Sequence, residues 1–294
     1  MSTSLANAVQ VTVGGLATGS LYAVILLGVI LVFQVSKNMN FAYGQTGMIG
    51  TFVSYVLYTD LGVPVWAAVV VGIAAAVVIA ALTDFLIIRR IPAQQGFDVV
   101  VTLGELLLLT ALAQIVFGAS AQSYLKLLTD VPVVSEGIFV NGNDVLAIGI
   151  GVGVTVGGYL VLTRTRLGTS LRAAAADAAV AQSVGINVRG LRTAMWAASG
   201  VFVAVGAMMF ASRLSVNAFY MTPIVINVFI AGMIGGLDRY WPPMLGAFGI
   251  AIYQSWAVFL FGEAGGVPAL FILIILILTF MPKRYLEERY EARA

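Results

Sequence analysis

The sequence predicts an all-α, polytopic membrane protein with about eight or nine transmembrane helices. The first observation is composition: 61% of the 294 residues are hydrophobic, 10% are charged, and the mean hydropathy is +1.02. The second is that apolar stretches near membrane length recur along the chain. The third is a single long basic stretch, 163–192, that interrupts this pattern. Because lipid offers no partner for free backbone groups, apolar spans of this kind must be helical.

Apolar segments recur on both sides of this basic stretch, and we expect one transmembrane domain over residues 1–294. The nine segments are 10–33, 40–58, 63–88, 97–118, 145–162, 193–214, 223–236, 241–261 and 267–281. Small residues spaced four apart let helices pack closely in a membrane. Two segments carry such stripes, namely Gly15 with Gly19 in the first, and Gly149, Gly153 and Gly157 in the fifth.

Basic residues predict the orientation of the chain. If all nine segments cross and the C-terminus is cytoplasmic, every one of the 15 Lys and Arg residues except Lys126 and Arg213 falls inside. The positive-inside rule favours this arrangement. The N-terminus and the loop 119–144 are then outside, and the tail 282–294 is a short, solvated cytoplasmic helix. The expected location is a bacterial-type plasma (inner) membrane.

The stretch 163–192 is then a cytoplasmic loop that carries five arginines. Thr169 or Ser170 can cap the start of a helix there. Residues 171–183 are rich in alanine and contain no proline or glycine, so they favour a helix. Gly185 can end that helix in the left-handed conformation. We expect a docking helix; the alternative, a helix lying on lipid headgroups, lacks the Trp or Phe anchors that such helices use.

Two apolar segments are irregular. Segment 40–58 opens with polar residues, and segment 223–236 has only 14 residues and contains an asparagine. Short or interrupted segments indicate broken helices near a substrate path. Candidate path residues are Asn40, Tyr43, Gln45, Glu105, Asn227 and Phe229. We expect Asn40, Gln45 and Asn227 to meet at a common central cavity, although each could simply bond to a neighbouring helix.

Glu105 is the deepest carboxylate in the predicted spans, eight residues into its segment. A carboxylate at that depth faces a cavity or a partner, or stays protonated. Its role, functional or structural, stays open at this point.

Several functions are excluded or disfavoured by missing residues. The chain has no histidine and no cysteine, which removes the commonest proton shuttle and all thiolate chemistry. It also lacks the phosphate-binding pattern GxxxxGK[ST]. No catalytic triad, paired catalytic carboxylates or metal-ligand cluster stands out. We therefore expect a transport protein that is not an enzyme, has no cofactor or metal of its own and binds no nucleic acid.

Three motifs in order resemble those of the permease subunits of branched-chain (hydrophobic) amino-acid ABC importers. Residues 40–45 (NFAYGQ) followed by 48–50 (MIG) are similar to that family's NFAHGE…MxGA signature. Residues 229–237, ending GGL, with Gly246 and Ala247 after them, are similar to its A-F…GGxGS…GA stretch. Together with the loop motif, these matches cover most of the chain.

The loop motif is the most specific of the three. Residues 165–168 (TRLG), 171–173 (LRA), Asp177 and 185–187 (GIN) are similar to the family's cytoplasmic loop R-x-G-x-x-x-R-A…D…G-I-N. The resemblance implies that this loop docks on an ATPase. The coupling residues that it implies are Arg166, Gly168, Arg172, Ala176, Asp177 and Gly185.

The resemblance also implies a multi-part importer. Its parts would be a second permease subunit, alike or different, two cytoplasmic ATPase subunits that hold ATP and Mg²⁺, and an external substrate-binding protein. This chain would form the path for branched-chain or other hydrophobic amino acids, or for a related small solute.

The departures from the family pattern leave the substrate open. Tyr43 replaces a His, Gln45 a Glu, residues 238–240 (DRY) a Gly-Ser, and Gln254 a common Glu, while Glu105 replaces a small or neutral residue. The alternatives are an importer of the same class for urea, amides or aromatic carboxylates, and an ion-coupled secondary transporter. A channel for a small neutral solute is a further alternative.

Overall fold

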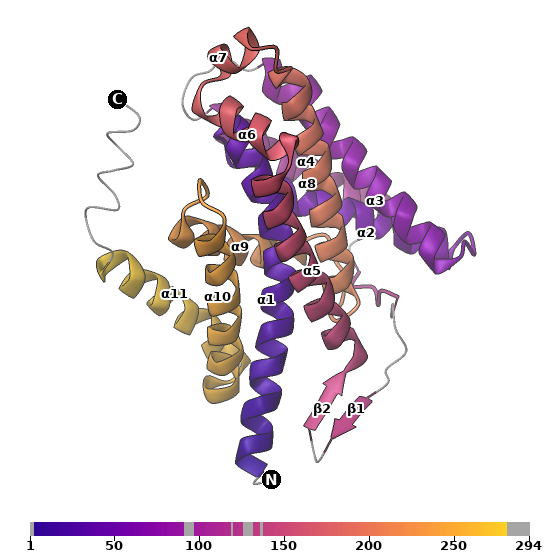
Figure 1. Ribbon diagram of the computed structural model, residues 1–294. Coiled ribbons are helices and arrows are strands. Elements are labelled where there is room, and N and C mark those ends of the chain that lie inside the picture. Colours follow the sequence, from indigo (N-terminus) through magenta and orange to yellow (C-terminus); the bar gives the residue numbers. More distant parts are fainter. Residues whose placement is uncertain (1–2, 91–96, 119, 126–131, 136–137, 281–294) are drawn as a thin grey trace.

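The computed structural model describes residues 3–90, 97–118, 120–125, 132–135 and 138–280. Its elements are shown in Figure 1. In chain order they are α1 (Thr3–Ser36), α2 (Tyr43–Thr59), α3 (Val65–Leu82), a π-helical turn (Thr83–Ile87), a 3-10 turn (Ile88–Arg90), α4 (Phe97–Phe117), β1 (Pro132–Ser135), β2 (Ile138–Asn141), α5 (Gly142–Arg164), α6 (Arg166–Ala176), α7 (Ala178–Ser183), α8 (Val188–Ala211), α9 (Met221–Gly235), α10 (Trp241–Phe261) and α11 (Glu263–Phe280). Lys126 and the tail 282–294 lie outside the described residues.

The predicted helical membrane fold is confirmed. Each of the nine predicted segments forms a helix, and six helices of the described chain are long and apolar enough to cross a membrane. The structure adds one short antiparallel hairpin, β1–β2, which an all-α class does not include.

The two irregular segments are short helices without an internal break. Helix α2 has 17 residues and α9 has 15. At about 1.5 Å per residue they reach about 26 and 22 Å, less than the roughly 30 Å of a hydrocarbon core. The interruption in helical geometry lies elsewhere, at the end of α3, where Thr83–Ile87 forms a π-helical turn. Turns of this kind are frequent at functional sites.

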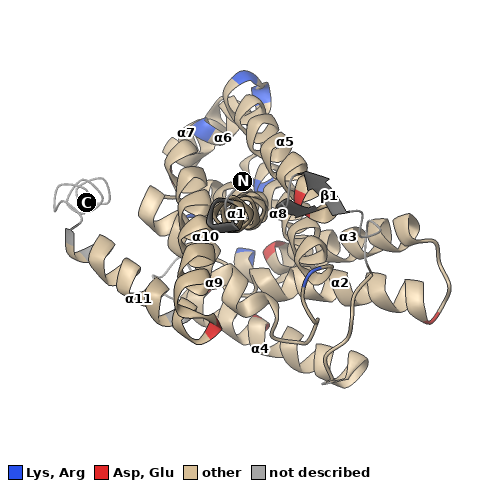
Figure 2. Ribbon diagram, turned by 90° about the horizontal axis from the view of Figure 1, so that it is seen from below, with Lys and Arg blue, Asp and Glu red and all other residues tan. Residues whose placement is uncertain are grey.

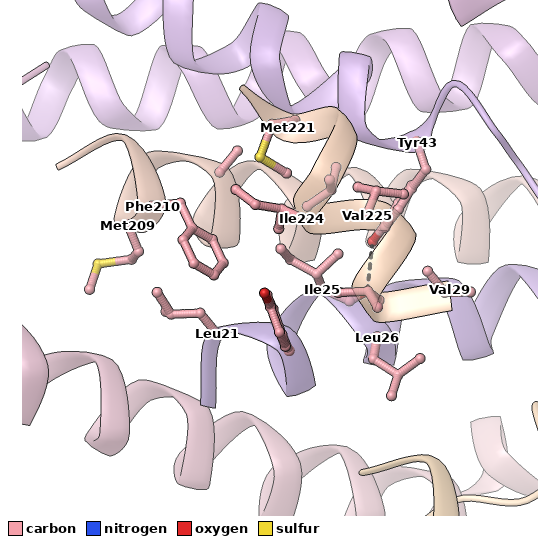
Figure 3. Packing of buried hydrophobic residues seen from close by; sticks show 14 of the residues in the cluster. Leu21, Ile25, Leu26, Val29, Tyr43, Met209, Phe210, Met221, Ile224 and Val225 are labelled. Atoms are coloured by element: carbon pink, nitrogen blue, oxygen red, sulfur yellow. Dashed lines mark hydrogen bonds between the residues drawn. The ribbon is translucent and has the colours of Figure 1, made fainter. Parts of the chain in front are cut away.

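Helix α1 is the centre of the bundle. Figure 2 looks along it and shows α5, α8, α9 and α10 around it, and these helices all contact it. Its most hydrophobic stretch is 83% buried, against 22% for α3, α4 and α5, whose outer faces are therefore free to meet lipid. Leu21 and Ile25 of α1 pack with Phe210 of α8 and with Met221 and Ile224 of α9 (Figure 3).

Glycines set how closely α1 is approached. Gly15 and Gly19 face α10, where an added Cβ would stand 2.9 Å from a backbone Cα atom, so the first predicted stripe is confirmed. The stripe predicted on α5 is wrong, because no atom lies within 4 Å of a Cβ added at Gly149, Gly153 or Gly157. The face of α5 that meets α1 carries Gly151 instead, which packs on Ser20. Sequence spacing marks several small-residue faces, and packing selects one of them.

Loops predicted to share a side of the membrane do contact one another. Lys37, between α1 and α2, pairs with Asp238, between α9 and α10, at 2.8 Å. Gln122 and Val216 form a β-bridge between the loop after α4 and the loop after α8. Figure 1 places α6 and α7 at the opposite end of the molecule from the β-hairpin and the start of α1. These contacts agree with the predicted sides of the four loops.

Cysteine labelling tests that arrangement in cells. Ser123 lies in the loop after α4 and Ser183 ends α7, on opposite predicted sides of the membrane, and the chain has no cysteine of its own. An impermeant maleimide applied to intact cells is expected to label Ser123→Cys and to leave Ser183→Cys unlabelled until the cells are opened. Equal labelling of both in intact cells would contradict the topology.

The glycine contacts predict that valine at two nearby positions of α5 will have different effects on the free energy of unfolding. Gly151→Val places a side chain within 2.7 Å of the Ser20 backbone, and overpacking of this kind costs about 1–3 kcal/mol. Gly153→Val meets no atom within 4 Å and is the control. Denaturant unfolding in micelles should show a lower free energy of unfolding for Gly151→Val alone. Equal values for the two variants would show that this approach does not hold α5 to α1.

Candidate functional site

A cavity of about 660 Å³ lies between α1, α9 and α10. Val11, Gly14, Thr18 and Tyr22 line it from α1, and their spacing of three or four puts them on one helical face. The same cavity reaches Asp144 at the start of α5. It therefore extends from the end of the molecule that carries the β-hairpin to the middle of α1. The volume falls within the range of about 300–1,000 Å³ that is usual for small-molecule sites.

Three polar side chains lie at the inner end of this cavity. The Asn227 amide donates to the Tyr22 hydroxyl at 2.9 Å and to Gln254 Oε1 at 3.2 Å. The Tyr22 hydroxyl in turn donates to Gln254 Oε1 at 3.1 Å. These bonds join α1, α9 and α10 at a depth where lipid would leave polar groups without partners.

An ion pair lies at the outer end of the cavity. Arg213, in the loop after α8, contacts Asp144, in the first turn of α5, and each side chain is 21% exposed. Burial lowers the pKa of the Arg213 guanidinium below its ordinary value. The N-terminus of α5 also favours the Asp144 carboxylate, because the helix dipole is positive there.

Sequence reasoning missed Tyr22, Asp144 and Arg213 as site residues. One signal could have found Arg213: of the basic residues, it and Lys126 alone fall on the predicted outer side. Gln254 was visible only as a departure from a family pattern. Tyr22 and Asp144 carry no signal of their own, because nothing in the sequence tells which helices enclose the cavity.

The structure separates the predicted path residues. Asn227 lines the large cavity, whereas Asn40, Tyr43 and Phe229 surround a separate space of about 10 Å³, room for one water at most. Asn40 Oδ1 accepts from the Ala42 N–H at 2.9 Å and so fixes the start of α2.

Tyr43 and Gln45 act as packing and bonding groups. The Tyr43 hydroxyl donates to the Ser199 carbonyl at 2.9 Å, and it lies where a Cβ on Gly28 would be. Gln45 Nε2 donates to the Thr110 hydroxyl at 3.2 Å and to the Thr222 hydroxyl at 3.3 Å. The expectation of one cavity shared by Asn40, Gln45 and Asn227 is therefore wrong for this conformation: Gln45 ties α2 to α4 and α9.

Phe229 and Glu105 also lie away from the large cavity. Phe229 stacks edge to face with Phe41 at 5.6 Å between ring centroids. Glu105 is buried and accepts a hydrogen bond from the Thr83 hydroxyl, while its other oxygen has no partner among the described residues. It is not among the residues that line the 660 Å³ cavity.

Next to Thr83, a buried carboxylate joins two elements. The Asp84 side chain is fully buried and pairs with Arg192 at 2.7 Å and with Arg89 at 3.1 Å. It also accepts from the Thr193 hydroxyl at 2.6 Å. Arg192 and Thr193 belong to the first turns of α8, directly after the basic loop. We call Asp84, Arg89, Arg192 and Thr193 the Asp84 clamp; it fixes the start of α8 to the end of α3.

The basic loop holds two helices where one was predicted. Thr165 caps α6 through the Gly168 N–H at 3.3 Å, so the helix begins before residues 169 and 170. It ends at Ala176, because Asp177 turns extended and its carboxylate accepts from the N–H groups of Ala179 and Val180 at 2.8 and 3.0 Å. Residues 171–183 are helical as predicted except at Asp177, so the prediction of one continuous helix is wrong: Asp177 is an N-cap, and a capping side chain competes with helix continuation.

Other loop residues hold α6 against the bundle. Gly168 packs on the Leu162 carbonyl, and the Arg172 guanidinium donates to that same oxygen, which satisfies the last turn of α5. Leu171 is fully buried. Gly185 has φ of +87°, so the predicted left-handed stop is confirmed.

The outer side of the loop is exposed and partly apolar. Arg166 opens α6 and Ala176 closes it, and both are exposed. Val180 of α7 is 59% exposed and Val184 is 70% exposed, although they lie at an end of the molecule that carries arginines. Small and apolar side chains presented this way suit a partner's groove.

Across the described residues, no group of three or more Asp or Glu side chains is placed to hold a metal ion.

Comparison with known proteins identifies relatives along the whole chain. Residues 11–280 match the family described as branched-chain amino acid transport system / permease component. The high-affinity branched-chain amino acid transport system permease protein BraD of Pseudomonas aeruginosa is 25% identical, with 93% of this chain and 94% of that protein covered. The corresponding LivH of Escherichia coli K12 is 26% identical, with 96% of each covered. A probable branched-chain amino acid transport permease protein LivH of Methanocaldococcus jannaschii is 22% identical, with 92% and 90% covered.

The match extends over nearly all of the membrane-spanning helices and includes the capped basic loop. The chain is therefore a multi-pass membrane protein that belongs to the family of branched-chain amino acid transport system permease components.

Proposed function

We propose that this chain is the transmembrane permease subunit of an ATP-driven importer and forms the path for branched-chain or other hydrophobic amino acids. The observation that carries the proposal is the two-helix basic loop at the end opposite the cavity. A subunit without a nucleotide site needs such an element to receive movement from an ATPase. The relatives named for branched-chain amino acid transport support the substrate class.

The proposed assembly follows from this role. It contains a second permease subunit, two cytoplasmic ATPases that bind ATP and Mg²⁺, and an external binding protein. The chain lies in the inner membrane with its N-terminus outside and its C-terminus in the cytoplasm, so that the cavity faces the binding protein and the loop faces the ATPases. The chain itself performs no catalysis.

The alternative functions require different residues at the substrate path or predict different transport behaviour. An ion-coupled transporter needs a titratable group at the substrate path, and Glu105 bonds to Thr83 away from the cavity. An importer of urea, amides or aromatic carboxylates would have the same loop. Uptake of radiolabelled L-leucine by cells that express the whole importer separates these cases: the proposal requires uptake that stops when the ATPase is inactivated. Leucine uptake independent of the ATPase would contradict it.

Movement reaching the loop has a direct route to the spans through the Asp84 clamp. Gly185 and Asn187 connect α7 to α8, where the Asn187 side chain caps the helix through the Gly190 N–H at 2.9 Å. One turn later, Arg192 and Thr193 bind Asp84 at the end of α3. The ion pairs of Asp84 with Arg89 and Arg192 thus join the loop to the membrane-spanning helices. Because these side chains are largely buried, salt in the solvent screens the ion pairs only weakly.

The exposed end of α6 predicts a coupling variant. Ala176→Trp adds bulk on the outer side of the loop, where Ala176 is exposed, so folding and insertion should be unaffected. We expect the purified complex to lose the stimulation of ATP hydrolysis by loaded binding protein. Ala176→Ser, which stays small, is the control. An Ala176→Trp complex stimulated like the parent would show that α6 does not seat against the ATPase.

The Asp84 clamp predicts a loss of both stability and coupling. Asp84→Asn leaves the guanidinium groups of Arg89 and Arg192 without their carboxylate. Removing one partner of a buried ion pair costs about 3–5 kcal/mol. Denaturant unfolding should show that loss, and the complex should transport less leucine per ATP hydrolysed. Asp60→Asn, at an exposed site, is the control. Unchanged stability and transport in Asp84→Asn would contradict the clamp.

A further inference from the structure

The 660 Å³ cavity combines one positive charge, one negative charge and apolar walls, and the role of this combination follows from the proposed function. We propose that the cavity is a recognition site for the zwitterionic head of a hydrophobic L-amino acid, with Arg213 binding the carboxylate and Asp144 the ammonium group. The site thus discriminates substrates within the permease itself, after the binding protein has released them.

The charges favour a zwitterion over other small solutes. Arg213 and Asp144 are in contact, so the outer end of the cavity presents both signs side by side. A monocarboxylate would pair with Arg213 and meet repulsion from Asp144, and an amine would meet the reverse. Juxtaposed like charges of this kind reject wrong partners. Urea and simple amides have no charge to offer in place of the ion pair.

Partial burial gives this discrimination its strength. Each of the two side chains is 21% exposed, so both charges have lost most of their water. A ligand with a single charge would break the ion pair and leave the other protein charge buried and unpaired, which is costly. A zwitterion exchanges one ion pair for two and leaves neither charge without a partner.

The rest of the cavity suits a branched apolar side chain. Leu214, Ile224 and Val258 line it, and Phe210 adds an aromatic wall. At the inner end, Asn227 and Gln254 bond to each other and to Tyr22. A largely apolar chamber with a few convergent polar groups is the usual form of a small-molecule site.

Protection from thiol labelling tests the site directly. The reporter is Ser255→Cys, a near-isosteric change at a residue that lines the cavity. The chain has no other cysteine, so labelling on it reports this position alone. The permease–ATPase complex is purified without the binding protein and treated with a maleimide. We expect L-leucine to slow labelling at least tenfold more effectively than 4-methylpentanoate, which lacks the amino group, or isoamylamine, which lacks the carboxylate.

Charge variants assign the two groups. In Arg213→Gln, protection by L-leucine should fall at least tenfold while that by isoamylamine rises, because the amine then pairs with Asp144 without breaking an ion pair. In Asp144→Asn, protection by L-leucine should fall likewise while that by 4-methylpentanoate rises, because the carboxylate then meets Arg213 alone. Ser123→Cys, outside the cavity, is the control and should label at the same rate with or without L-leucine. Circular dichroism and thermal unfolding of both charge variants show whether they remain folded; if either unfolds, the analogue comparison in the parent decides.

The outcomes separate this site from the proposed function. Equal protection by all three ligands, or none by L-leucine, overturns the zwitterion site even if the complete importer takes up leucine. Absence of leucine uptake by the complete importer overturns the proposed function, whatever the labelling shows.

Discussion

Close approach to α1 is the constraint on which the rest of the structure depends. In a membrane, helices gain nothing from hiding apolar surface from lipid, so they associate through tight packing and internal polar bonds. Gly15 and Gly19 allow α10 to pack closely against α1, and Gly151 allows α5 to do the same. Gly28 leaves room for Tyr43, whose hydroxyl then bonds to the backbone of α8. Tyr22, Asn227 and Gln254 are polar side chains that lipid could not satisfy, and they bond to one another between α1, α9 and α10.

The arrangement around α1 divides the molecule into two working ends. The cavity reaches Asp144 at the start of α5, and α6 and α7 follow the other end of α5. Figure 1 places α6 and α7 opposite the β-hairpin. The Asp84 clamp joins the loop end to α3. Figure 2 shows that charged residues are few along the helices, so each buried charge stands out as a specific contact. The proposed recognition site and the proposed coupling element therefore use separate residues.

The sequence predicted the spans well because their length and hydropathy are local properties. It predicted the left-handed Gly185 for the same reason. It failed where the tertiary partners of a residue decide its role: Gln45 and Asn227 are both polar residues within apolar segments and both bond to other helices, yet only Asn227 lines the cavity. The break at Asp177 could have been predicted from the local sequence, because an aspartate followed by alanines is a strong helix N-cap. The Arg213–Asp144 pair was not, because it joins residues far apart in the chain.

The extended backbone at Asp177 has a mechanical consequence. Helix α6 is fixed to the bundle by Gly168 and Arg172, whereas the exposed face of α7 begins beyond a non-helical residue. Helices α6 and α7 are thus two rigid segments joined at one extended residue, Asp177, which can act as a hinge. If an ATPase docks on this loop, as proposed, a load on α7 would turn it about Asp177 and pull on α8, whereas α6 would be held by its contacts with α5. The angle between α6 and α7, more than a displacement of α7 along the membrane normal, would then transmit movement of the ATPase to the membrane-spanning helices.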